Sequence, residues 1–304
     1  MILIIFPEFN LRRKGCLYMK KIKGYVIEKY THMSNSYTCK RLKEEAVKRN
    51  VDLEIIGVND IYYIDGNIYH GNIKLEKRDF VINRFPSGKI KDKFNLLAQR
   101  QYNRLEYFNI FINKFNQLDK FNFKSDIKKP KTILATTSMD FDILKNLLNI
   151  PFIAKGLESS EGKEIFLIEN KDDYIELSKF GNESKEFVFQ EFISTSFGRD
   201  IRLYSIKGNI VASMIRESDV DFRANIALGG KGTKFEVDEN IKNIAKEIYE
   251  QSKLDFLGID LLFGEKEPYY CEINIKAGIK GMETATGINV AGKIIDEIVR
   301  DINE

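Results

Sequence analysis

Short apolar runs are the first pattern along the chain. Runs rich in β-branched residues cover residues 2–6, 52–58 and 79–83 and are typical of buried strands. A helical pattern separates the first two. Strands that alternate with helices form parallel sheets covered on both faces. Residues 1–98 are therefore expected to form a small α/β domain.

The helical pattern covers residues 34–49. It begins near a capping serine, and Leu42, Ala46 and Val47 recur on one side of the predicted helix. A turn sequence then precedes residues 67–69, which predict a short hairpin arm.

The middle of the chain changes from helical to strand patterns. Residues 94–118 predict an amphipathic helical region, and residues 138–148 predict a second helix. Apolar runs over 151–155 and 186–193 predict strands. Residues 99–190 are expected to form a central domain.

Residues 191–304 are expected to form a C-terminal domain. Strands are predicted over residues 199–206 and 211–216. The helix predicted over 237–254 has a clear apolar stripe, which is most simply core packing.

The stretch Leu257–Asn274 contains two short apolar strands joined by the charged turn Gly264–Pro268. If the loop is centred on its middle residue, Asp260 lies directly opposite Glu272. Asn274 shares a face with Glu272, because strand residues two apart point the same way. Like charges opposite one another destabilise a sheet unless a cation lies between them, and an all-oxygen ligand set suits Mg²⁺. A surface hairpin with solvated carboxylates is the alternative.

Composition narrows the class of protein. The 304 residues are 43% hydrophobic, which is enough for a sizeable core, and the net charge of only +3 gives no case for a nucleic-acid or membrane partner. The apolar run at the start is shorter than a signal peptide requires. We expect a cytoplasmic protein. The basic cluster near the start is interpreted as a solvated face, with an acidic partner as the alternative.

Cysteine and histidine usage excludes several kinds of site. Cys16, Cys39 and Cys271 have no metal-binding spacing and are expected to be reduced thiols. His32 and His70 are too few for a typical histidine metal site. No nucleophile elbow accompanies them, which argues against a hydrolase triad.

Three arginines follow at a spacing that can bring them together. Arg202 and Arg216 fall on consecutive predicted strands, and Arg223 falls in the loop after them. Arginine suits phosphoryl oxygens because it stays charged and donates in a planar fork. Without further context, the three would be ordinary surface charges.

Two segments carry a family resemblance. The run from Glu272 through a glycine-rich loop to Gly292 resembles the C-terminal block of the ATP-grasp carboxylate–amine ligases. Within them it is most similar to the RimK branch, whose members add glutamate to a ribosomal protein or ligate amino acids to other small molecules or peptides. Asp221-Phe-Arg-Ala-Asn225 followed by Gly229-Gly230 resembles the RimK-type Asp-Phe-Arg-Ser-Asn string, with Ala224 in place of the serine. The resemblance extends from about residue 105 to the C-terminus, and the first 100 residues match only in element pattern.

The resemblance implies an α/β protein of the ATP-grasp fold. It would have a small N-terminal parallel-sheet domain, a central α+β lid domain and a C-terminal antiparallel-sheet domain with the metal site. The cofactors would be ATP and Mg²⁺ or Mn²⁺. The metal would bind at Asp260, Glu272 and Asn274, and Arg202, Arg216 and Arg223 would be catalytic. The implied nucleotide-binding residues are Lys120, Lys155, Ser160, Gly162, Gln190, Glu191, Phe192, Asp200, Arg223, Ala224 and Asn225.

The implied reaction is ADP-forming ligation of an acid to an amine. A substrate carboxylate would become an acylphosphate, which an amine such as that of glutamate would convert to an amide on a protein, peptide or small-molecule acceptor. A kinase on the same scaffold and a nucleotide-binding protein without catalysis remain the alternatives. The sequence does not define the substrates or the oligomeric state, although the family is often dimeric or tetrameric.

Overall fold

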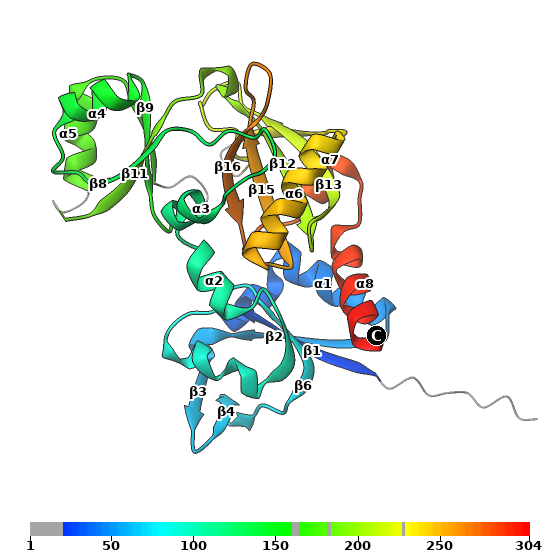
Figure 1. The fold of residues 1–304 in the computed structure, drawn as a ribbon. Helices are drawn as coiled ribbons and strands as arrows, with labels where there is room; N and C mark the ends of the chain where they lie inside the picture. The colour runs from blue at the N-terminus through cyan, green and yellow to red at the C-terminus, as the bar shows by residue number, and fades with distance from the viewer. Residues whose placement is uncertain (1–20, 160–163, 181–183, 227–228) are drawn as a thin grey trace, which may run out of the picture.

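The computed structural model describes residues 21–159, 164–180, 184–226 and 229–304. These residues form four β-sheets together with the helices that pack on them (Figure 1). The strand expected over residues 2–6 lies outside these ranges. The mixed α/β architecture predicted from the sequence is confirmed. Among the described residues, no helix combines the length and apolar character needed to cross a membrane.

The first sheet is parallel, as predicted, with the strand order β2-β1-β6-β7. Val26 on the central strand β1 lies between Ile55 and Ile82, and all three are buried. The strands are β1 (Ile22–Glu28), β2 (Val51–Gly57), β6 (Arg78–Asn83) and β7 (Ala98–Tyr102).

Helix α1 (Tyr37–Lys48) packs against β2 and starts later than expected. Its capping residue is Ser36, whose hydroxyl accepts a hydrogen bond from the Cys39 N–H. Leu42 and Ala46 are buried as predicted. Val47 is 78% exposed, so its assignment to the buried side was wrong. The residue lies just outside the stripe that faces the sheet.

The helical region expected over residues 94–118 is only partly helical. It contains the end of a 3₁₀ segment (η3, Lys89–Leu96), strand β7, and two short helices, α2 (Leu105–Phe111) and α3 (Lys114–Lys120). The prediction missed β7 because this strand is at the sheet edge and carries exposed polar side chains instead of an apolar run.

Two smaller connections complete the first half of the chain. The predicted hairpin arm is part of a three-stranded sheet. Its strands are β3 (Ile61–Ile64), β4 (Asn67–His70) and β5 (Ile73–Lys74). Short 3₁₀ segments are η1 (Thr31–Asn35) and η2 (Val58–Asp60).

The central sheet is antiparallel with the order β10-β9-β11-β8, and α4 and α5 cover one of its faces (Figure 1). Phe152, Phe187 and Phe189 form much of the core between sheet and helices. The elements are β8 (Thr132–Thr136), α4 (Phe141–Leu148), β9 (Phe152–Gly156), β10 (Ile165–Ile168), α5 (Lys171–Phe180) and β11 (Glu186–Glu191).

The largest sheet is antiparallel with the order β14-β13-β12-β15-β16. Helix α6 packs its predicted apolar stripe into the core beneath it. The elements are η4 (Ser194–Ser196), β12 (Arg199–Ile206), β13 (Asn209–Glu217), β14 (Lys231–Lys234), α6 (Glu239–Ser252), β15 (Phe256–Leu262), β16 (Tyr269–Asn274), α7 (Lys280–Thr286) and α8 (Val290–Asn303).

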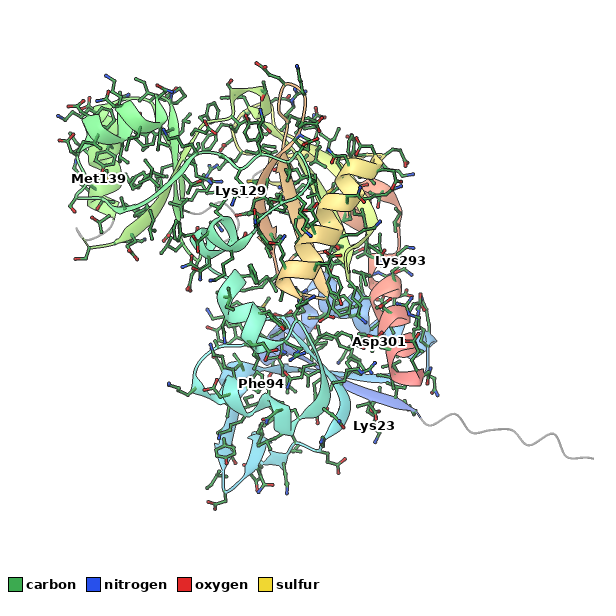
Figure 2. All side chains as sticks on the ribbon, viewed as in Figure 1. Lys23, Phe94, Lys129, Met139, Lys293 and Asp301 are labelled. Carbon is green, nitrogen blue, oxygen red and sulfur yellow. The ribbon has the colours of Figure 1, made fainter. Side chains whose placement is uncertain are left out.

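The C-terminal helix α8 packs against elements from the N-terminal part of the chain. It packs against α1, and Ile295 shares one hydrophobic core with Val26 of the first sheet. Asp301 lies near the end of α8 (Figure 2). It accepts a hydrogen bond of 3.0 Å from the Tyr102 hydroxyl. The first sheet and the C-terminal part are therefore parts of one packed unit.

Candidate functional site

A cavity of about 340 Å³ lies between the central sheet and the largest sheet. Ile153, Lys155 and Ile165 line it from the central sheet, and Asp260 and Glu272 line it from β15 and β16. The segment from Phe192 to Gly198 connects the two sheets across one end of the cavity. Apolar side chains and charged side chains thus face each other across a single space.

Cross-strand register brings the charged residues together. Asp260 on β15 lies directly between Arg202 on β12 and Glu272 on β16. The pairing of Asp260 with Glu272 confirms the register that the hairpin turn predicted. Asn274 lies two residues further along β16 and also lines the cavity. Neighbouring residues of one row across a sheet point to the same face, so the row presents a cation followed by two carboxylates.

Two arginines hold the carboxylate of Asp260. The Arg202 guanidinium donates to both carboxylate oxygens, and Arg216 Nη2 lies 3.1 Å from Asp260 Oδ2. Arg216 also donates to both oxygens of Asp200, at 2.7 and 2.6 Å. Burial alone would raise the pKa of Asp260, but Arg202 and Arg216 outweigh it and hold that pKa below its ordinary value. Asp260 is therefore ionised at neutral pH.

Asp200 is paired with Arg216. The family resemblance directed it at the ribose or the nucleotide edge. It does line the cavity, yet both of its oxygens bind Arg216. In this structure Asp200 positions a guanidinium.

A β-bulge brings Cys271 to the cavity. The register between β15 and β16 shifts just after Asp260, and this leaves Cys271 as the extra residue beside Glu272. The Lys155 ammonium, on β9 of the other sheet, lies 3.7 Å from the Cys271 sulfur. Burial raises the pKa of the Cys271 thiol to about 11. The thiol is therefore neutral at physiological pH, and the Lys155 charge remains available to a ligand.

Lys114 is a cavity residue that the sequence did not indicate. It is the first residue of α3, and its ammonium lies 2.7 Å from the Ser159 carbonyl oxygen and 3.1 Å from Glu272 Oε2. Lys120 is the last residue of the same helix, is exposed and lies outside the cavity lining. The N-terminal end of this short helix, rather than its C-terminal end, therefore faces the cavity.

The predicted nucleotide hinge is anchored at its start. Gln190 Nε2 donates to the Thr132 hydroxyl at 3.0 Å, and the Lys131 N–H donates to Glu191 Oε1 at 2.8 Å. The Phe192 ring lies edge-on to Phe222, with 6.5 Å between ring centroids. This end of the cavity is apolar and suits a flat ring with a few polar atoms on its edge.

The first part of the Asp221-to-Gly230 string, residues 222–226, lines another side of the cavity. Arg223 Nη2 lies 2.7 Å from Asp221 Oδ2, and Ala224 and Asn225 line the cavity beside Arg223. A Cβ on Gly230 would lie 2.6 Å from the Ala224 carbonyl oxygen, which is closer than real contacts allow. Glycine at residue 230 is therefore what allows its backbone to lie against Ala224 and Asn225.

Most of the predicted site residues line the cavity. Those that do are Lys155, Gln190, Glu191, Phe192, Asp200, Arg202, Arg216, Arg223, Ala224, Asn225, Asp260, Glu272 and Asn274. Ser160 and Gly162 lie outside the described residues. Lining residues that the prediction missed include Lys114, Ser159, Arg199, Cys271, Lys280 and Met282. No spacing or composition signal marks these, because only the packing of distant elements brings them to the cavity.

The oxygen-bearing residues fit a hard divalent cation. Asp260, Glu272 and Asn274 supply two carboxylates and a carboxamide on one face, and each is already near a donor: the two arginines, Lys114 and the Lys276 N–H respectively. Among the described residues, no three His, Cys, Asp or Glu side chains are grouped to hold a metal. A cation here would need oxygens from a ligand as well, which is how Mg²⁺ binds with phosphates.

Comparison with known proteins gives one consistent result. A family described as the RimK-like ATP-grasp domain matches residues 112–298. A probable alpha-L-glutamate ligase of Legionella pneumophila (strain Corby) is 30% identical over 277 residues, which are 86% of this chain and 91% of that protein. The ribosomal protein bS6–L-glutamate ligase of Escherichia fergusonii is 28% identical over 278 residues, which are 87% of this chain and 92% of that protein.

Solved structures share the fold at low sequence identity. ATP-grasp ligase PsnB, complexed with a minimal precursor, aligns with a TM-score of 0.71 at 15% identity over 92% of this chain and 99% of that chain. The D-alanine–D-alanine ligase of Bacillus anthracis, complexed with ATP, aligns with a TM-score of 0.67 at 15% identity over 92% and 97%. The ATP-grasp fold expected from the sequence is thus confirmed.

Proposed function

Because the chain belongs to the RimK-like ATP-grasp family, we propose that it is an ATP-dependent ligase that forms C–N bonds and releases ADP. Two of its relatives are named as L-glutamate ligases. The proposed product is an amide between an amino acid, with glutamate as the first candidate, and a protein, peptide or small-molecule acceptor.

The proposed reaction has two steps. A substrate carboxylate attacks the γ-phosphorus of ATP, the bond to the bridging oxygen breaks, and ADP leaves an acylphosphate behind. An amine then attacks the acyl carbon, loses a proton and displaces inorganic phosphate. The protein mainly has to position the reactants and stabilise phosphoryl charge.

The apolar end of the cavity is assigned to the adenine ring. Ile153 and Ile165 would pack against the ring, and the backbone at Glu191 and Phe192 would contact its polar edge. Lys155 and Lys114 would neutralise phosphates. We move to Lys114 the contact that the resemblance placed on Lys120, because Lys114 lies in the cavity.

The charged end is assigned to the transferring phosphoryl group. Asp260, Glu272 and Asn274 would hold Mg²⁺, which when bound neutralises phosphate charge. Arg202 and Arg216 are fixed by buried carboxylates and would present their guanidiniums to the acylphosphate, with Arg223 beside them. Asp200 then has a positioning role toward Arg216.

The observation that carries this proposal is the row Arg202–Asp260–Glu272 facing an apolar pocket in the same cavity. The test is a screen for ADP release with Mg²⁺ and ATP over the amino acids, each paired with candidate acids or a peptide. Mass analysis of the product should show a new amide together with free phosphate. A stable phosphate ester would identify a kinase instead, and tight nucleotide binding without turnover in any pair would indicate a binding protein.

Several narrower expectations stay proposals. Mn²⁺ is the alternative to Mg²⁺ in the oxygen site, the protein would work in the cytoplasm, and copies of the chain would form a homo-oligomer. The division into domains at residues 1–98, 99–190 and 191–304 is also retained as a proposal.

A further inference from the structure

A half-buried lysine beside the cavity has no acidic partner. Lys276 follows Asn274 by two residues, and its ammonium lies 4.1 Å from the centroid of the Phe85 ring. Among the described residues, no carboxylate oxygen comes within 4.0 Å of that ammonium. A bound anion would stabilise a half-buried ammonium that has no ion pair within the described part of the chain.

The carboxyl ends of the parallel strands β1 and β6 lie on the other side of the Lys276 ammonium. Phe85 follows β6, and its N–H donates to the Ile27 carbonyl oxygen of β1 at 2.9 Å. Lys29, just after β1, lies 5.8 Å from the same Phe85 ring and is exposed. The carboxyl ends of parallel strands are where ligands collect in sheets of this kind. Two ammonium groups thus converge on one ring at such an edge.

The loop that carries Lys276 is fixed to the first sheet and to the cavity. Arg84 is paired with Glu28 at 2.6 Å and donates to the carbonyl oxygens of Lys276 and Ala277 at 3.5 and 3.4 Å. The Lys276 N–H donates to Asn274 Oδ1 at 3.1 Å. The backbone of Lys276 is therefore fixed next to the proposed metal face, and its side chain starts from that fixed point.

The charges around Lys276 suit a carboxylate better than a triphosphate. Lys29 and Lys114 act on it as neighbouring cations, and Glu28 and Glu158 act on it as anions. The charge of Glu28 is taken up by Arg84, and Lys114 is engaged by Glu272. The two cations Lys276 and Lys29 and the one anion Glu158 then remain. This small excess of positive charge beside one carboxylate matches an amino acid, which carries both a carboxylate and an ammonium.

We propose that Lys276 and Lys29, grouped around Phe85, bind a carboxylate of the amino acid that supplies the amine. This inference rests on the proposed ligase function and names a subsite for one of its substrates. The free amine would then lie toward Asn274 and Gly278, both of which line the cavity.

The test is calorimetric titration of L-glutamate into protein saturated with Mg²⁺ and a non-hydrolysable ATP analogue. Wild-type protein should bind glutamate. Lys276→Met should weaken that binding about ten-fold or more, which is the loss expected for a charge-assisted contact. Lys276→Arg should stay within about three-fold, and Lys29→Met should show a smaller loss than Lys276→Met because Lys29 is exposed. Lys246→Met, at an exposed position on α6, is the matched control.

Two amides identify which carboxylate is bound. L-Glutamine lacks the side-chain carboxylate and L-isoglutamine lacks the α-carboxylate, so one of them should bind wild-type protein as weakly as L-glutamate binds Lys276→Met. If both amides bind like glutamate, or if Lys276→Met binds glutamate normally, the subsite is overturned. Absence of glutamate binding to nucleotide-loaded wild-type protein also overturns it.

Nucleotide affinity separates this inference from the proposed function. All variants should bind the ATP analogue within about two-fold of wild type, which also shows that they are folded. Failure of the wild-type protein to bind the analogue would count against the ligase proposal itself. Normal nucleotide binding with no effect at Lys276 would count against the amino-acid subsite alone.

Discussion

The ammonium of Lys114 lies 3.1 Å from the carboxylate of Glu272. One residue begins a short helix in the middle of the chain and the other is on the last strand of the largest sheet, 158 positions later. The contact places a cation beside a proposed metal ligand before any nucleotide is bound. Phosphate oxygens would then meet an ammonium that is already positioned for them.

Lys114→Met should lower the affinity for Mg²⁺ and an ATP analogue about ten-fold or more, because a charge-assisted contact to phosphate is lost. Lys120→Met is the matched control on the same helix and should change the affinity less than about two-fold. Calorimetric titration of both variants measures the difference. An equal loss in the two variants would show that the Lys114 contact has been misassigned.

Glu272→Gln should reduce Mg²⁺-dependent ADP formation about 100-fold or more, because a neutral amide is a poor magnesium ligand. The protein should stay folded, since glutamine keeps the size of the side chain and Lys114 keeps its hydrogen bond to the Ser159 carbonyl oxygen. Glu265→Gln, in the exposed turn of the same hairpin, should behave like wild type. Chelation of magnesium should abolish turnover in every protein, and ADP release by Glu272→Gln at the wild-type rate contradicts the metal assignment.

Arg216→Met should destabilise the fold by about 3–5 kcal/mol, because it leaves the buried carboxylates of Asp200 and Asp260 without a shared cation. Urea unfolding gives the free energy. Arg300→Met removes the exposed partner of Glu297, which keeps its ion pair with Lys207, and should cost less than about 1 kcal/mol. Asp200→Asn combined with Arg216→Met should cost less than the sum of the single changes, and strict additivity would mean that the pair does not interact.

Asp255 should make stability fall as the pH rises. Burial raises the pKa of its carboxyl to about 6, although the Asn103 N–H donates to it at 2.8 Å. Between about pH 4 and pH 6 the folded protein keeps a proton that the unfolded chain has lost. The contribution of this group to the free energy of unfolding therefore decreases through that window, by at most about 1.4 kcal/mol per pH unit.

Asp255→Asn removes that titration while keeping an oxygen for the Asn103 N–H. Urea unfolding of both proteins from about pH 4.5 to about pH 7 should show the variant gaining stability relative to wild type as the pH rises. Taking the difference between the two proteins cancels the other titrating groups. A difference that stays constant with pH would show that Asp255 titrates normally.

Local chemistry determined which parts of the structure the sequence could predict. The opposition of Asp260 and Glu272 follows from strand alternation and the position of one turn, and both are local. Edge strand β7 could not be predicted in the same way, because its exposed residues Gln99 and Arg100 interrupt the apolar run that marks a buried strand. Val47 was misplaced because a helix pattern gives the width of its apolar stripe only approximately.

The site residues likewise divide into those marked by a local sequence pattern and those brought together only by packing. Residues within the Asp221-to-Gly230 string and the Glu272-to-Asn274 run were identified because neighbouring residues mark them. Lys114 could not be distinguished from Lys120, since their difference arises only when α3 docks beside β16. The pairing of Asp200 with Arg216 is likewise a product of strand register, which the family pattern alone does not reveal.

The packing of α8 against α1 has a consequence for synthesis. Val26 and Phe80 share a core with Ile295 and Ile298. The first sheet is therefore synthesised well before the helix residues that cover it. About 200 residues separate β7 from that part of α8, a delay of roughly 10–40 s at ordinary translation speed. During that interval part of an apolar sheet face of the nascent chain is exposed. Chaperones that bind apolar surfaces are expected to bind the nascent chain at this stage.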